Sequence, residues 1–209
     1  MLGAAAVAMW WDLAPRMKAQ FEDWHSHEHM PERLAIPGFL RGSRWIALSG
    51  RPSYFVLYEA AKLATLTRGA YLQRLNHPTP WSRKLMPHHR NMVRSLCVVR
   101  ASFGAVLGHA MATIRFSPGN GRRLLPRRLE QLSKRKGLGG CHLLESQSMA
   151  GMRRTTEQKI RGHDATADWV LLVCGYDVEA LKAVVAGELA PGTQKTALYR
   201  LAYSLSSRE

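Results

Sequence analysis

The segment Phe21–Arg33 reads FEDWHSHEHMPER and lies where a helical pattern gives way to a reversal of the chain. Large apolar side chains recur near helical spacing from Arg16 to Met30, which predicts a helix over this range. Pro31 is expected to end or kink that helix, and Ile36-Pro37-Gly38 prevents it from continuing. The segment is therefore interpreted as the end of a first helix that leads into a β-strand.

The chain around this segment predicts the order β-α-β-β-α-β. The expected strands are residues 4–11, 39–48, 54–59 and 92–103, and the expected helices are 16–30 and 60–75, with a helical turn at 81–86. The same order recurs in the second half. There the expected strands are 107–116, 141–147, 169–176 and 196–205, and the expected helices are 122–136 and 178–188. The polar stretch 149–168 is predicted to be a mobile loop without regular structure, and 119–121 a turn.

These patterns predict an α+β fold of two tandem ferredoxin-like βαββαβ units with antiparallel sheets packed face to face. The units are expected at 1–103 and 104–209, with the boundary between Phe103 and Leu107. A ferredoxin-like sheet has helices on one face only, so two such sheets hide their bare apolar faces by packing together. A tandem chain can do this internally, so the protein is expected to fold without a partner, although a homodimer is possible.

The first unit also resembles a known family. The matching residues are Trp24, Glu28, His29, Pro31, Glu32 and Arg33, followed by Ile36-Pro37-Gly38-Phe39. They resemble the EthD-type members of the dimeric α/β-barrel superfamily, and the resemblance covers roughly residues 4–103. In the second half only the fold pattern is similar. The resemblance implies a dimeric α/β-barrel fold, in a superfamily that includes isomerases, decarboxylases, cyclases, monooxygenases and haem-handling enzymes.

Composition limits the possible classes of protein. The 209 residues are 46% hydrophobic and 22% charged, which is ordinary for a globular protein, and no apolar run is long enough to cross a bilayer. The net charge of +15 comes mostly from dispersed arginines without a nucleic-acid-binding motif, so we expect attraction of an anionic small molecule rather than of nucleic acid. Cys97, Cys141 and Cys174 show no disulfide or metal spacing, which predicts buried thiols and a cytoplasmic protein.

The catalytic candidates are His25, Glu28 and His29. On a helix these three side chains share one face, and a carboxylate beside imidazoles can fix a tautomer and raise an imidazole pKa toward neutrality. General acid–base catalysis needs such an arrangement. The competing interpretation is that Glu28 and His29 only tie the helix end to the following loop. The second unit has no comparable cluster.

Five further residues are candidates for substrate binding. Arg33 could hold a carboxylate or phenolate, and Trp24 could form an apolar wall, although a core role is the stronger interpretation for it. Tyr58 could supply a phenol from the third strand, while His77 and Trp81 lie in a loop that could close over the site. The pair His88-His89 is expected on the surface, exposed to solvent.

His25, Glu28 and His29 also have the His-x-x-Glu-His spacing of one class of zinc peptidases. Pro31 follows the second histidine closely, no third-ligand motif is present, and the rest of the chain predicts a different fold. We therefore expect no metal and no other cofactor.

Three functional classes remain open. The first is a cofactor-independent enzyme that acts by general acid–base chemistry on an aromatic or polyketide-like substrate, as an isomerase, cyclase or decarboxylase. The second is a non-catalytic module that binds a small-molecule ligand, and the third is an oxygenase or haem-handling relative. The sequence does not decide whether the protein is an enzyme.

Overall fold

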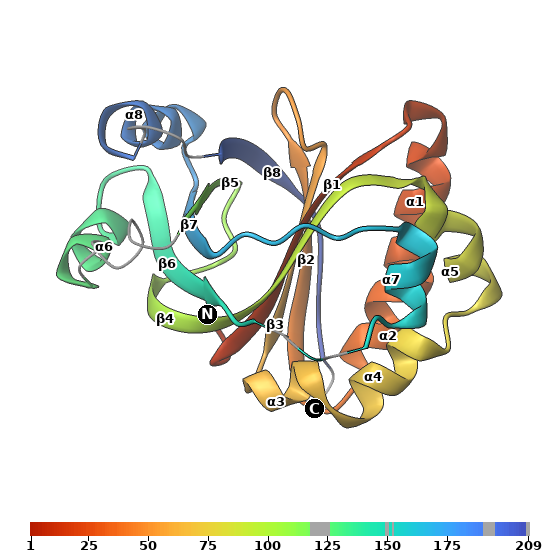
Figure 1. Ribbon diagram of the computed structural model, residues 1–209. Helices are drawn as coiled ribbons and strands as arrows, with labels where there is room; N and C mark the ends of the chain where they lie inside the picture. Colours follow the sequence, from red (N-terminus) through yellow and green to blue (C-terminus); the bar gives the residue numbers. More distant parts are fainter. Residues whose placement is uncertain (118–125, 149–150, 152, 190–194, 208–209) are drawn as a thin grey trace.

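Eight antiparallel strands form one closed barrel in the computed structural model, which describes residues 1–117, 126–148, 151, 153–189 and 195–207 (Figure 1). The strands of the first unit are β1 (Ala5–Leu13), β2 (Phe39–Ala47), β3 (Tyr54–Ala60) and β4 (His89–Gly104). Those of the second are β5 (Ala110–Phe116), β6 (Leu138–Ser146), β7 (Trp169–Gly175) and β8 (Lys195–Ser206). Every predicted strand is present, with ends shifted by up to three residues.

The strand order around the barrel is β1-β3-β2-β8-β5-β7-β6-β4. Each unit therefore has the ferredoxin-like order, and the two sheets also join at their edges through the β2–β8 and β4–β6 pairs. This closure leaves no free sheet edge, the feature that makes open sheets prone to aggregate. The predicted fold class of two tandem ferredoxin-like units is confirmed.

Alternating strand residues face two different interiors. On β1, Ala6, Ala8 and Trp10 point into the barrel, and Trp10 stacks on Phe55 with ring centroids 4.9 Å apart. Ala5, Val7 and Trp11 face the helices on the outside. Side chains fill the barrel, so we look for the functional site in the layer between sheet and helices.

The helices of the first unit cover one side of the barrel, and α6 (Pro126–Ser133) and α8 (Val178–Glu188) cover the other (Figure 1). The first group comprises η1 (Pro15–Met17), α1 (Lys18–Trp24), η2 (His25–His29), α2 (Met30–Leu34), α3 (Leu63–Thr67), α4 (Gly69–Asn76), α5 (Pro80–Leu85) and η3 (Met86–His88). The single helix predicted over 60–75 is in fact two, since Arg68 is extended and Gly69 has a φ of 57° between them.

Two further predictions about the elements were wrong. The first helix does not end near Met30, because the chain stays helical through Leu34. The stretch 149–168 is not wholly irregular, because Thr156–Arg161 forms helix α7, whose Thr155 cap accepts a hydrogen bond from the backbone of Gln158. Although α7 belongs to the second half of the sequence, it packs on the first unit beside α4 (Figure 1). The predicted turn at 119–121 and the start of the helix predicted from Arg122 lie outside the described residues.

No helix in the described part of the chain is both long and apolar enough to span a membrane.

Candidate functional site

The histidine-rich segment forms a single π-helical turn, η2, between α1 and α2. The N–H of Met30 donates to the carbonyl of His25, five residues back. In a regular α-helix the ring of Pro31 would collide with the carbonyl four residues before it, and we attribute the wider turn to this proline. The turn directs His25 and His29 toward the sheet, with their ring centroids 5.6 Å apart.

Both imidazoles lie in an aromatic layer between this helix and the sheet. The exposed fraction is 2% for His25 and 8% for His29, while Trp24 lies 4.4 Å from the ring of His29. The hydroxyl of Tyr58 lies 3.5 Å from Nε2 of His25. The Nδ1 atoms of both histidines have no hydrogen-bond partner among the described residues. A buried polar atom without a partner is costly, so water or a ligand atom is the expected partner here.

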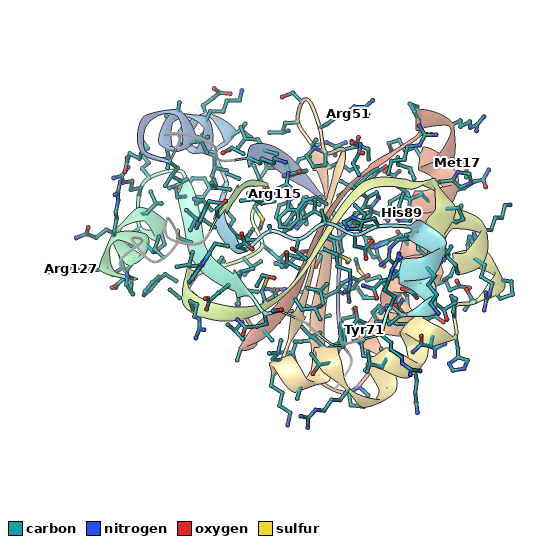
Figure 2. The ribbon with its side chains drawn as sticks, in the orientation of Figure 1. Met17, Arg51, Tyr71, His89, Arg115 and Arg127 are labelled. Carbon is teal, nitrogen blue, oxygen red and sulfur yellow. The ribbon has the colours of Figure 1, made fainter. Side chains whose placement is uncertain are left out.

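A third imidazole belongs to the same layer. His89 lies at the start of β4, between the sheet and the helices of the first unit (Figure 2), and is 8% exposed. Its ring centroid lies 5.1 Å from that of Trp11 and 5.6 Å from that of Phe21. The prediction that His89 is exposed to solvent was wrong. The short η3 turn before the strand brings it inward, and its Nδ1 contacts the carbonyl of Met86 at 3.0 Å.

Burial keeps all three imidazoles neutral. It lowers the pKa of His25 well below the ordinary value, and Arg44, His89 and Arg33 add to the effect. Burial, Arg33 and His25 likewise hold the pKa of His29 well below its usual range. For His89, burial and the charge of Arg161 lower the pKa to about 3. The expectation that a carboxylate raises an imidazole pKa here was wrong, because burial lowers the pKa of each ring and nearby arginines lower it further.

Glu28 faces away from the imidazoles. Its Oε1 accepts hydrogen bonds from Nε1 of Trp24 at 3.0 Å and from the hydroxyl of Thr79 at 2.6 Å. Thr79 in turn caps α5 by accepting from the backbone of Ser82 at 3.0 Å. In this structure Glu28 therefore ties the first helix to the α4–α5 loop, and not to the loop that directly follows the helix.

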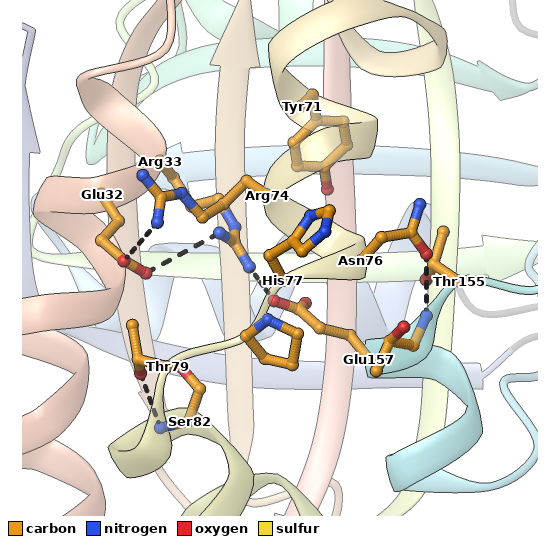
Figure 3. Close-up of polar contacts among 12 residues, drawn as sticks. Glu32, Arg33, Tyr71, Arg74, Asn76, His77, Thr79, Ser82, Thr155 and Glu157 are labelled. Atoms are coloured by element: carbon orange, nitrogen blue, oxygen red, sulfur yellow. Dashed lines mark hydrogen bonds and ion pairs between the residues drawn. The ribbon is translucent and has the colours of Figure 1, made fainter.

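Arg33 is buried and already paired. Its Nη2 donates to Glu157 of α7, and both residues are 2% exposed (Figure 3). Oε2 of Glu32 lies 4.0 Å from Nη1 of Arg33, and Oε1 of Glu32 forms a closer ion pair with Nη1 of Arg74 at 3.0 Å. Burial alone would lower the pKa of Arg33, but the Glu157 carboxylate raises it. The guanidinium predicted to hold a substrate anion thus contacts a carboxylate of the protein itself.

The remaining predicted site residues lie farther out. Trp24 is 1% exposed and belongs to the core, and Trp81 is partly buried against the same core. His77 is exposed at the end of α4, where its Nδ1 contacts the carbonyl of Gln73 at 2.8 Å. It lines a surface cavity of about 280 Å³ between α2 and α4, together with Glu32 and Arg74. The structure therefore groups His25, His29, Tyr58, Arg33 and Trp24. Glu28 contacts this group through Trp24, Trp81 packs against the same core, and His77 is exposed outside it.

Three residues of the layer were missed from the sequence. Arg44, on β2, is 5% exposed, lies 5.9 Å from the ring centroid of Phe21, and has no hydrogen-bond partner for its Nε among the described residues. His89 and Glu157 are the others. Strand alternation could have assigned Arg44 to this layer, because Arg44 and Tyr58 lie on the same face of the sheet. In contrast, no local sequence signal connects Glu157 to Arg33, which lie 124 positions apart.

In the described ranges, no three histidine, cysteine, aspartate or glutamate side chains are grouped so that they could hold a metal ion. The layer does not fit a haem as it stands. A haem needs a flat cavity beside an axial ligand, but aromatic rings pack directly on His25, His29 and His89.

Comparison with solved structures shows the class of fold. No family model matches the chain, and no curated protein sequence is significantly similar. A candidate monooxygenase from Fusobacterium nucleatum aligns over 100% of both chains, with 11% identity and a TM-score of 0.59. An anthrone oxidase-like protein aligns over 98% of this chain and 93% of its own, with 10% identity and a TM-score of 0.61.

A chlorite dismutase-like protein aligns over 97% of this chain and 96% of its own, with 10% identity and a TM-score of 0.50. At such identities the likeness extends to the fold alone. The chain therefore has the dimeric α/β-barrel fold, with both halves of the barrel in one polypeptide. The likeness does not single out the EthD-type family that the sequence resembles.

Proposed function

We propose that the protein is a small-molecule enzyme that removes a proton from an activated C–H group of an aromatic or polyketide-like substrate, with His25 or His29 as the base. The observation that carries this proposal is the pair of buried, neutral imidazoles whose Nδ1 atoms have no hydrogen-bond partner in the described structure. A neutral imidazole has a free lone pair, and proton removal is the step that isomerisation, cyclisation and decarboxylation of such substrates share.

The cations of the layer support this chemistry. A base whose pKa is this low is weak, because its protonated form is penalised by burial and by neighbouring positive charges. An enolate formed beside the ring would offset that penalty, since the imidazolium and the enolate form an ion pair. Arg44, which influences the pKa of His25, could stabilise the same negative charge, and Tyr58 could orient the imidazole through Nε2.

Access to the imidazoles requires a covering element to move. None of the cavities that we describe in this structure is lined by His25 or His29. Helix α7 is the best candidate, because it is six residues long and Arg161 on it lies close enough to affect both His29 and His89. Opening of a short lid before chemistry is common among enzymes of this size.

Proton exchange tests the proposal directly. Anthrone, the kind of compound named for one of the similar structures, carries an acidic C–H whose exchange in D₂O can be followed by NMR under nitrogen, where oxidation cannot interfere. We expect the protein to accelerate exchange and His25→Asn or His29→Asn to reduce the acceleration by about a hundredfold. The matched control is His27→Asn, since His27 is exposed on the same turn and contacts Asp23 at 2.8 Å.

If folded wild-type protein does not accelerate exchange in anthrone or in related phenolic ketones, the enzymatic proposal is wrong. The same conclusion follows if His27→Asn lowers the rate as much as the two buried variants do. The strong depression of the imidazole pKa favours a second candidate, a non-catalytic ligand-binding module. That alternative would be supported by anthrone binding without exchange.

A further inference from the structure

A further guanidinium of the same layer, that of Arg94, lines two cavities beside α7. Arg94, on β4, borders one cavity of about 140 Å³ and another of about 360 Å³, and Leu96 and Gln158 are also shared by both. The smaller cavity has an apolar wall of four leucines, Leu66, Leu72, Leu75 and Leu96. It combines a hydrophobic chamber with a cation at its edge, as binding sites for small amphiphilic molecules do.

The protein fixes the position of Arg94. Its backbone N–H donates to the carbonyl of Ala165 at 2.8 Å, and Ala165 donates back to the carbonyl of Met92 at 2.9 Å. Its Nη2 donates to the hydroxyl of Tyr71 at 3.0 Å. Among the described residues, no carboxylate lies within ion-pair distance of Arg94, and its side chain is held by the Tyr71 hydroxyl.

The carboxylates near Arg94 form ion pairs with other arginines. Glu157 pairs with Arg33 and lies 3.5 Å from Arg161, while Asp164 pairs with Arg161 at 2.9 Å. Glu32 adds a third carboxylate and pairs with Arg33 and Arg74, so the guanidiniums of the cluster outnumber its carboxylates by four to three. A partly buried cluster with one excess positive charge attracts an anion.

The lining of the two cavities decides where that anion binds. The smaller cavity is lined by Arg94 and by Arg153 and Arg154 at its rim, and no carboxylate lines it. Arg154 is held in place through Nη2, which donates to the carbonyl of Gln158 at 3.0 Å. The larger cavity is lined by both Asp164 and Asp168, which would repel an anion. Charge therefore favours the smaller cavity.

We propose that this cavity of leucines and arginines is a binding site for a single-ring aromatic carboxylate. A cavity of about 150 Å³ lined by apolar side chains is enough to hold benzene, so a volume of about 140 Å³ accommodates one ring. The ring lies against the leucines, and the carboxylate accepts charge-assisted hydrogen bonds from Arg94. This site lies apart from the histidines, and it stands whether or not they act on the ligand.

Calorimetric titration of the whole protein with benzoate tests the proposal. We expect benzoate to bind and benzamide, which has the same shape without the charge, to bind at least tenfold more weakly. Arg94→Gln should weaken benzoate binding at least tenfold, whereas Arg90→Gln, at an exposed position on the same strand, should leave it unchanged. Leu72→Phe should abolish binding by filling the chamber while the guanidinium remains.

Thermal denaturation establishes that each variant is folded. Absence of benzoate binding to the wild type overturns the proposal, as does equal affinity of the wild type and a folded Arg94→Gln variant. Equal affinity for benzoate and benzamide would also overturn it, because the arginine would then play no part. The titration needs no turnover, so its result is independent of the proton-exchange assay.

Discussion

The side chains of His25, His29 and His89 are uncharged bases in a buried layer that also contains several arginines. Their neutrality has one cause at each position, the loss of water around the ring, and neighbouring guanidiniums strengthen it. Since an imidazole of this kind binds a proton only in the unfolded chain, each histidine links stability to pH.

We predict that the protein loses stability as the pH falls below about 6.5, the pKa of an unfolded histidine. In this range the histidines bind protons in the unfolded state but not in the folded state. The free energy of unfolding therefore falls as the pH falls, by at most about 1.4 kcal/mol per pH unit for each histidine. For His89 the loss continues until its folded pKa of about 3. Urea denaturation between pH 7 and pH 5 should show a smaller slope for His89→Phe. Equal slopes for variant and wild type would contradict the burial of His89.

The buried pair of Arg33 and Glu157 yields a second prediction at this scale. Glu157→Gln leaves the desolvated guanidinium of Arg33 with only the more distant Glu32 as a counter-charge, which costs about 3–5 kcal/mol. Urea denaturation should show this loss, and the double variant Arg33→Met, Glu157→Leu should recover most of it, since apolar side chains of similar size often replace a buried pair. Glu188→Gln, which removes an exposed pair with Arg135, is the control and should have little effect. A loss no larger than that of the control would show that the pair is open to solvent.

Helical elements from both halves of the sequence form the site. The continuous run from α1 through η2 to α2 supplies the imidazoles, and α7 brings Glu157 and Arg161 from the other half of the sequence. The run is held over most of its length, because Phe21, Trp24 and Met30 are buried in the core. In contrast, α7 is short and depends on its cap and on its ion pairs.

The capping box of α7 can be tested on its own. Thr155→Val keeps the shape of the side chain but removes the hydroxyl that accepts from the backbone of Gln158. We expect a cost of about 1 kcal/mol, localised to this helix. Hydrogen exchange should therefore accelerate at the amides of 156–161 and remain unchanged in β1 and β3. Uniform acceleration across the barrel would mean that α7 does not open as a separate unit.

The sequence predicted the elements better than their contacts. Period-two patterns located all eight strands, and helical spacing placed the candidate histidines of Phe21–Arg33 on one face of the first helix. They did not locate α7, since its few apolar residues give no periodic signal, and its stability comes from Thr155 and from Arg33 far away in the chain. The pKa of the imidazoles was predicted in the wrong direction because burial and Arg44 depend on tertiary packing.

At the scale of the whole molecule, barrel closure creates three separate cores. One lies inside the barrel, and one lies between the sheet and the helices of each unit. All three histidines of the layer lie in the first unit, and α7 of the second half adds Glu157 and Arg161 to it. The corresponding layer of the second unit is packed with aliphatic side chains such as Ile114, Leu129 and Leu171.

The reactivity of the three cysteines tests this architecture. Cys97 and Cys174 lie inside the barrel and Cys141 lies in the second helix layer, and burial raises the pKa of each thiol to about 12. We expect no reaction of the native protein with dithiobis(nitrobenzoate), and reaction of all three thiols in guanidinium chloride. Rapid reaction of Cys97 or Cys174 in the native state would contradict the closed barrel, and rapid reaction of Cys141 would contradict the packing of the second helix layer.

The central claim is that the layer of the first unit presents neutral imidazoles to a ligand, and NMR of protein with ¹⁵N-labelled histidine tests it most directly. At pH 6 the ring nitrogens of His25 and His29 should show the chemical shifts of neutral imidazole, and addition of anthrone should change the Nδ1 shift of at least one of them. Shifts of protonated imidazole at pH 6, or ring signals that no aromatic ligand perturbs, would contradict the account.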